Sequence, residues 1–121
     1  MCGLVGVIGD INEAEKRMFD YMLKLDTIRG PHSTGIARIH TNKRDTLDIV
    51  KGLGTPWHMI NEKSKDYYAG GTKGMDGNYI ALMGHNRWAT VGGIKEENAH
   101  PFNAGNIVGA QNGTILSLIH I

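Results

Sequence analysis

The sequence predicts an α+β fold, in which one helix follows a first strand and most later elements are strands. Three observations support this class. A short apolar, β-branched run opens the chain, apolar residues at helical spacing follow it, and strand-like runs between polar or glycine-rich turns make up the rest. No repeat and no low-complexity linker is found, so we expect a single domain or part of one.

The first two elements are a strand and a helix. Residues 3–9 (GLVGVIG) are apolar and bounded by glycines, which predicts a buried strand, and Asp10 or Asn12 can cap the helix that follows. We expect the helix to end within 26–30. Its buried face is predicted from helical spacing to consist of Ile11, Ala14, Met18, Met22 and Leu25. Its polar face is predicted to carry Glu13, Lys16, Arg17, Asp20 and Lys24.

The rest of the chain is predicted to be mostly strands. Four more runs have strand-like patterns, at 35–40, 46–51, 79–83 and 106–111. The connections between them are a turn at 41–45, a second helix from Pro56 to Tyr68, a glycine-rich loop at 69–78 and a polar segment at 92–98.

Composition excludes several classes of function. The formal net charge is +1, which gives no electrostatic basis for binding nucleic acid or an anionic membrane. No apolar stretch is long enough to span a bilayer. The single cysteine fits a reducing, cytoplasmic compartment. The six histidines lack metal-ligand spacing, so we expect neither a metal nor a cofactor.

The single cysteine, Cys2, becomes the first residue if Met1 is removed, and the small side chain at position two favours that removal. A thiol attacks only as the thiolate, so it needs a base to take its proton. A terminal cysteine carries a suitable base in its own α-amino group, whose ordinary pKa is about 7.7–8.0. The alternative interpretation is that Cys2 is a small buried hydrophobe, as free cysteines usually are.

Four blocks then resemble one family in the right order. Residues 1–6 (MCGLVG) resemble the opening of class II glutamine amidotransferases, which are N-terminal-nucleophile hydrolases. The family's Arg-Gly-x-Asp-Ser-x-Gly and Gly-His-x-Arg-Trp-Ala-Thr motifs are similar to 29–35 (RGPHSTG) and 84–90 (GHNRWAT). Its Asn-Ala-His-Pro and His-Asn-Gly motifs are similar to 98–101 (NAHP) and 111–113 (QNG). The block at 84–90, which contains a tryptophan, and Asn-Ala-His-Pro favour the glucosamine-6-phosphate synthase branch of this family.

The resemblance implies a fold and an activity. The fold is the four-layer αββα sandwich of N-terminal-nucleophile hydrolases. The activity is hydrolysis of L-glutamine to glutamate and ammonia through a γ-glutamyl thioester on Cys2. The ammonia would pass to a synthase domain or subunit, with an acceptor such as a sugar phosphate.

The resemblance also assigns roles to residues. Cys2 would be the nucleophile, and Asn112 and Gly113 would supply the two donors of the oxyanion hole. Substrate-binding roles fall to Arg87, Thr90, Trp88 and His100, with Arg87 holding the glutamine carboxylate. Supporting roles in the nearby turn fall to Arg29, Gly30 and Ser33. Purely structural alternatives stay open: Trp88 can be a core aromatic, His100 a structural histidine, and Asn112-Gly113 a hairpin turn.

The sequence departs from the family at His32, Gln111 and Val91, where Asp, His and His are usual. Residues 1–115 are expected to be the N-terminal part of the amidotransferase domain, and 116–121 a non-native tail. No acidic residue after Gly113 can bind the substrate's α-amino group. We therefore expect a truncated sandwich with unpaired strand edges, marginal stability and a tendency to aggregate. Two other functions remain: an amidase of another N-terminal-nucleophile family, and a non-catalytic glutamine-binding or interaction domain.

Overall fold

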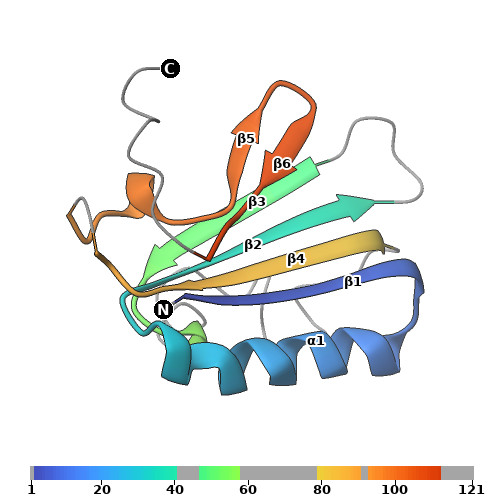
Figure 1. Cartoon of the computed structure of the whole chain (residues 1–121). Coiled ribbons are helices and arrows are strands. Elements are labelled where there is room, and N and C mark those ends of the chain that lie inside the picture. Colours follow the sequence, from blue (N-terminus) through green and yellow to red (C-terminus); the bar gives the residue numbers. More distant parts are fainter. Residues whose placement is uncertain (1, 41–46, 58–78, 91–92, 113–121) are drawn as a thin grey trace.

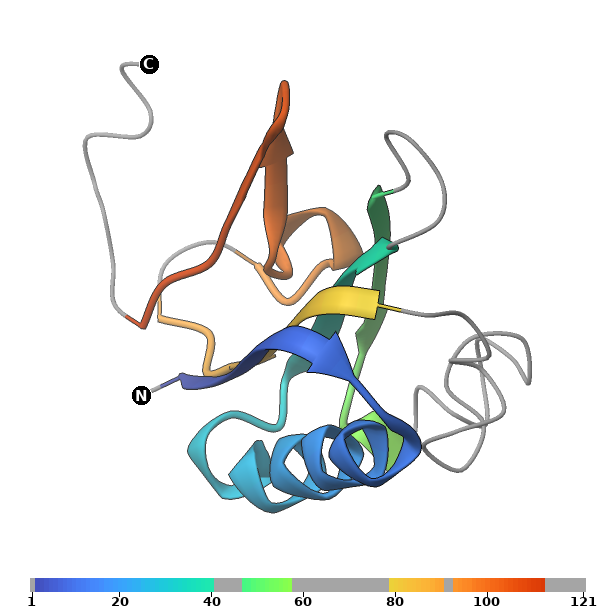
Figure 2. The same cartoon turned by 90° about the vertical axis from the view of Figure 1, so that its right-hand side faces the viewer.

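The computed structural model describes residues 2–40, 47–57, 79–90 and 93–112. These residues form two antiparallel sheets and one α-helix, which confirms the α+β class (Figure 1). The larger sheet has the order β1-β4-β2-β3, and the smaller one is the hairpin β5-β6. Helix α1 lies on one side of the larger sheet and the hairpin on the other, as the turned view in Figure 2 shows. The elements in chain order are β1 (Gly3–Ile11), α1 (Glu13–Leu25), the 3-10 turn η1 (Asp26–Arg29), β2 (Ser33–His40), β3 (Leu47–Leu53), β4 (Tyr79–Arg87), the 3-10 turn η3 (Glu96–Asn98), β5 (Phe102–Ala104) and β6 (Ile107–Gly109).

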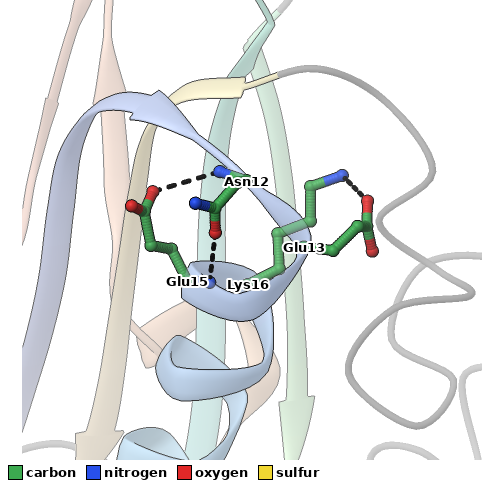
Figure 3. Close-up of polar contacts among 4 residues, drawn as sticks. All are labelled: Asn12, Glu13, Glu15 and Lys16. Atoms are coloured by element: carbon green, nitrogen blue, oxygen red, sulfur yellow. Dashed lines mark hydrogen bonds and ion pairs between the residues drawn. The ribbon is translucent and has the colours of Figure 1, made fainter.

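Helix α1 begins with a reciprocal pair of hydrogen bonds (Figure 3). The Asn12 side chain accepts from the backbone N–H of Glu15 at 2.8 Å, and the Glu15 carboxylate accepts from the backbone N–H of Asn12 at 3.0 Å. These bonds satisfy two N–H groups that have no partner inside the helix. Of the two caps the sequence allowed, the structure uses Asn12. The neighbouring Lys16 ammonium pairs with Glu13 at 2.7 Å.

Of the residues predicted for the buried face of the helix, Ile11 is buried at the end of β1, but α1 itself buries a different set. The residues that are buried are Lys16, Phe19, Asp20 and Leu23, whereas Ala14, Met18 and Leu25 are exposed and Met22 is half-buried. Phe19 and Leu23 are the pair, four residues apart, that packs over Gly84 of β4. Their bulk fits the hollow left by the missing Gly84 side chain, and this contact sets the rotation of the helix. Lys16 and Asp20, predicted to be on the polar face, are therefore buried.

The strands agree with the prediction in existence and differ in extent, and β1, predicted to be buried, exposes Leu4 and Ile8. β1 and β4 continue beyond the predicted ends because β1 pairs with β4 as far as Ile11, after a register shift, and β4 pairs with β2 as far as Arg87. The short strand β5 was missed, since three residues after a proline carry little periodic signal. The turn at 41–45, most of the helix predicted at 56–68, the loop at 69–78, Gly113 and the tail at 116–121 lie outside the described residues.

The larger sheet has two different faces. Towards α1 it buries a core of Ile11, Phe19, Leu23, Ile36, Tyr79 and Leu82, against which Val5 and Val7 pack. The opposite face presents Leu4, Ile8 and Ile39, which are 47%, 87% and 40% exposed. Between this face and the β5-β6 hairpin lies a mostly apolar cavity of about 1140 Å³.

The strand order places the chain's first residues beside a much later segment. β1 and β4 run antiparallel, with Gly3 opposite Asn86. The start of β1 therefore meets the end of β4, where Arg87 is followed by Trp88. This pairing carries Cys2 to the place where the functional residues gather.

Candidate active site around Cys2

Cys2 is buried, with 7% of its surface exposed, and its sulfur is held by the backbone of Trp88. The Trp88 N–H donates to Sγ at 3.3 Å, and the thiol can donate to the Trp88 carbonyl oxygen at 3.7 Å. An N–H aimed at sulfur stabilises negative charge on it. Two successive peptide units on either side of the Trp88 Cα thus fix the position of the Cys2 sulfur.

The backbone nitrogen of Cys2 is also held. Its N–H donates to Oδ1 of Asn112 at 3.1 Å, although the two residues are 110 positions apart in the sequence. Because the donor is an N–H, the acceptor must be the amide oxygen of Asn112. The amide NH₂ of the same side chain is then left to donate elsewhere, as an oxyanion hole requires.

The turn that the resemblance marked as supporting packs directly behind Cys2. Arg29 Nε donates to the Cys2 carbonyl oxygen at 3.1 Å. Gly30 lies against the peptide between Arg87 and Trp88, where a Cβ would be 2.7 Å from the Trp88 nitrogen. Ser33 is fully buried, and within the described ranges its hydroxyl has no hydrogen-bond partner. Arg29 therefore holds the Cys2 backbone in place, and Gly30 leaves room for the peptide whose Trp88 N–H bonds the Cys2 sulfur.

The predicted substrate-binding residues are dispersed around this centre. The Arg87 side chain is buried, and its Nη1 donates to the Gly93 carbonyl at 2.8 Å. Trp88 is 44% exposed, with its ring 5.3 Å from the His32 ring, and Thr90 is exposed. Gly113 lies outside the described residues.

His100 lies beside the segment that carries Asn112. Its ring stacks on that of His85, with centroids 4.1 Å apart and planes at 10°. The Gln111 N–H donates to His100 Nδ1 at 3.2 Å, and His85 Nε2 bonds the Gln111 carbonyl at 2.9 Å.

The surroundings lower the pKa of both imidazoles, which favours their neutral forms. Burial lowers the pKa of His85 below its usual 6.5. Burial, together with His85, Arg87 and Lys51, lowers the pKa of His100 to about 4. No role was predicted for His85 from the sequence. It belongs to the Gly-His-x-Arg block and lies two positions before Arg87 on β4.

Two further residues were not recognised from the sequence. His32, noted only as a departure, accepts the Ala89 N–H on Nδ1 at 2.8 Å, while its own N–H donates to the Arg87 carbonyl at 3.0 Å. The Asp26 carboxylate lies against Gly3, and burial raises the pKa of Asp26. His32 thus replaces the expected carboxylate contacts in this turn with bonds to the backbone on both sides of Trp88.

In ranges 2–40, 47–57, 79–90 and 93–112, no group of three or more His, Cys, Asp or Glu side chains could hold a metal ion. No helix in those ranges is long and apolar enough to cross a membrane.

Sequence comparison finds no matching family model but many related proteins. The chain is 35% identical over 120 residues to a glutamine–fructose-6-phosphate aminotransferase (isomerizing) of Sulfolobus acidocaldarius, which covers 95% of this chain and 18% of the relative. The corresponding protein of Methanococcus maripaludis is 38% identical over 101 residues, 84% of this chain and 14% of the relative. That of Streptococcus pyogenes serotype M1 is 33% identical over 123 residues, 100% of this chain and 18% of the relative.

The chain thus spans less than a fifth of the length of these curated relatives. The similarity nevertheless extends over nearly all of this chain, including every block on which the family resemblance rests. The chain belongs to the glutamine amidotransferase family represented by the glutamine–fructose-6-phosphate aminotransferases.

Proposed function

We propose that Cys2, after removal of Met1, is the nucleophile of a glutaminase site that converts L-glutamine to glutamate and ammonia. The observation that carries this proposal is the double anchoring of one residue. The Cys2 sulfur is bonded by the Trp88 N–H at 3.3 Å, and its nitrogen by Asn112 Oδ1 at 3.1 Å. A merely structural cysteine does not need both of its reactive atoms fixed.

The chemistry follows from these contacts. Once Met1 is removed, the Cys2 nitrogen is an amine that donates one hydrogen to Asn112 and keeps its lone pair for the thiol proton. The thiolate attacks the amide carbon of glutamine and forms a C–S bond and an oxyanion. The oxyanion collapses, the C–N bond breaks, and the amine returns the proton to the departing ammonia. Water then adds to the thioester and releases glutamate and the free thiol.

Asn112 is proposed to serve two atoms at once. Its oxygen holds the Cys2 nitrogen, and its NH₂ donates to the oxyanion together with the backbone N–H of Gly113. Removing one such donor typically costs about 10²–10³ in kcat. Arg87 is proposed to bind the α-carboxylate of glutamine, with Thr90 and Trp88 in the surrounding pocket. His100 is proposed to act on the site through the Gln111 backbone, whose N–H it accepts at 3.2 Å.

The test is the release of glutamate and ammonia from glutamine by the full-length protein, with its complete amidotransferase domain, and by its Cys2→Ala variant. We expect turnover in the wild type and none in Cys2→Ala, and intact-mass measurement should show loss of one methionine. Equal turnover in the two proteins would rule the proposal out. Retained Met1 would leave the amine blocked and favour a non-catalytic binding domain.

A second comparison separates a glutaminase from a general amidase. Glutamine and its decarboxylated analogue, 4-aminobutanamide, carry the same amide but differ in the α-carboxylate. We expect glutamine to be strongly preferred, and Arg87→Lys to reduce that preference because one amine cannot replace a bidentate guanidinium. Equal rates on both amides would point to an amidase of another N-terminal-nucleophile family.

We further propose that the acceptor of the ammonia is a sugar phosphate. The relatives are named for fructose 6-phosphate, and this supports the same chemistry here. We also propose that the described elements form part of a four-layer αββα sandwich. The apolar sheet face opposite α1, with its cavity beneath the β5-β6 hairpin, fits packing by further β structure.

A further inference from the structure

The backbone of Gln111 is held on both sides by two stacked imidazoles. Its N–H donates to His100 Nδ1 at 3.2 Å, and its carbonyl receives His85 Nε2 at 2.9 Å. His85 belongs to β4, whereas His100 precedes β5, so the two rings join the sheet to the segment carrying Gln111. The next residue is Asn112, whose side chain bonds the Cys2 nitrogen.

These bonds fix the tautomer of each ring. The Gln111 carbonyl can only accept, so His85 must carry its hydrogen on Nε2. The Gln111 N–H can only donate, so His100 must have no hydrogen on Nδ1. A protonated His100 would carry hydrogens on both nitrogens and lose the bond to Gln111. The two rings therefore act only while His100 is neutral.

The surroundings keep His100 neutral and in place. Arg87 and Lys51 bring positive charge towards it from β4 and β3, which opposes protonation of the ring. Lys51 also donates to the Ala99 carbonyl at 2.8 Å. Gly35 of β2 allows the His100 backbone to cross the sheet, since a Cβ there would overlap the His100 carbonyl oxygen.

We propose that His85 and His100 are positioning residues, which clamp the Gln111 backbone and so aim Asn112 at the Cys2 nitrogen and at the oxyanion. The assignment of Asn112 to the oxyanion rests on the proposed function, but the clamp itself does not. Neither histidine touches the reacting atoms in this account. Their effect passes through one backbone unit to the neighbouring side chain.

The clamp can be tested without any turnover, by amide hydrogen exchange at Gln111. His100→Asn keeps an acceptor near the position of Nδ1, whereas His100→Leu has similar size and no acceptor. We expect Gln111 exchange to rise about tenfold in His100→Leu and to stay near the wild-type rate in His100→Asn, since a lost bond of about 1.4 kcal/mol changes an equilibrium tenfold. Equal exchange in the two variants would overturn the clamp.

The positioning role is tested by kinetics on glutamine. His85→Gln keeps an N–H near Nε2, and His85→Met has similar size and no donor. We expect kcat to fall about tenfold or more in His85→Met and His100→Leu with little change in KM, and to recover in His85→Gln and His100→Asn. His40→Gln, which alters a histidine bonded to Asp48 at 2.8 Å, is the matched control and should keep its kcat.

Alkylation of Cys2 by iodoacetamide separates positioning from collapse of the site. The thiolate displaces iodide in one step, with a C–S bond formed and a C–I bond broken, so no oxyanion arises. We expect alkylation rates within about twofold of wild type in all four variants, since the sulfur is held by Trp88. Parallel losses of alkylation and kcat would mean that the site has collapsed, and would overturn positioning.

Failure of the proposed function and failure of the positioning role would give different results. Absence of glutamine hydrolysis in the wild type counts against the proposed function, while the exchange measurement still decides the clamp. Wild-type turnover with unchanged kcat in His85→Met and His100→Leu would refute the positioning role alone.

Discussion

At Gly30 the structure leaves room for a hydrogen atom and no more. A Cβ at this position would press on the peptide between Arg87 and Trp88, whose N–H bonds the Cys2 sulfur. We expect Gly30→Ala to shift that peptide, to slow Cys2 alkylation and to cost about 1–3 kcal/mol of stability. Urea unfolding and iodoacetamide kinetics measure the two effects.

The matched control is Gly109→Ala in β6, where a Cβ meets nothing within 4 Å. That variant should keep both its unfolding midpoint and its alkylation rate. A Gly30→Ala protein as stable and reactive as Gly109→Ala would show that the close packing behind Trp88 has no consequence.

The neutral state of His100 makes stability depend on pH. Its pKa is about 4 in the folded chain, against 6.5 for an ordinary histidine. As the pH falls from about 6.5 to 4, His100 binds a proton in the unfolded chain but not in the folded chain. The free energy of unfolding therefore decreases over this range. The titration of His100 lowers the free energy of unfolding by up to about 1.4 kcal/mol per pH unit in that window and has no effect above it.

The measurement compares the free energy of unfolding of wild type and His100→Asn at pH 7.5, 6.5 and 5.5. The difference in free energy of unfolding between wild type and His100→Asn should become smaller as the pH falls, because the asparagine cannot bind a proton. The lowered pKa of His85 acts in the same direction in both proteins, and the raised pKa of Asp26 acts oppositely in both, so neither accounts for the narrowing. A pH-independent difference would contradict the neutral assignment.

At the scale of elements, the start of α1 depends on Asn12. Replacing Asn12 by Ala leaves the Glu15 N–H without its partner, so we expect a loss of about 1 kcal/mol in the free energy of unfolding. Asn12→Ser keeps an oxygen acceptor and should lose only a few tenths. Equal losses in the two variants, measured by urea denaturation, would argue against the cap.

The elements also show where a sequence pattern suffices and where it does not. Strand β1 and the limits of α1 follow from local signals, namely a β-branched run between glycines and a capping asparagine. The buried face of α1 does not, because Met18 and Met22 are four residues apart, as Phe19 and Leu23 are. Only the glycine at position 84, opposite the helix in space, decides which set is buried.

The candidate site was predictable as a set of residues and not as a geometry. Family motifs pointed to Cys2, Arg29, Gly30 and Asn112, and the structure brings these four together. The bonds from Cys2 to Trp88 and Asn112 join residues 86 and 110 positions apart, which no local pattern encodes. His85 and His32 were missed because their side chains form hydrogen bonds with backbone atoms, and the positions of backbone atoms cannot be inferred from a sequence pattern.

At the scale of the whole molecule, the sheet presents an apolar face beside an edge strand. Ile8 lies on the edge strand β1 and is 87% exposed, so it contributes little to the core. We expect Ile8→Lys to change the free energy of unfolding by less than about 0.5 kcal/mol, since exposed sites tolerate substitution. It should reduce concentration-dependent association, because a charge on an edge strand opposes strand-to-strand pairing.

Light scattering across a concentration series checks the association, and urea unfolding checks the stability. Asp10→Asn, a change at an exposed position on the same strand, raises the net charge by one as Ile8→Lys does and so controls for charge. Association reduced equally by both substitutions would show that net charge, and not the apolar face, governs it.

The strand order also constrains when Cys2, the proposed nucleophile, can reach its place during synthesis. Among the strands that the structure describes, β1 pairs with β4 alone, so the first strand made waits for residues 79–87 before it gains a neighbour. Closing so long a loop is entropically costly and slows folding. Until β4 has left the ribosome, Trp88 cannot bond the Cys2 sulfur, and the amino terminus stays open to the proposed removal of Met1. Late arrival of the central strand would thus let processing precede assembly of the site.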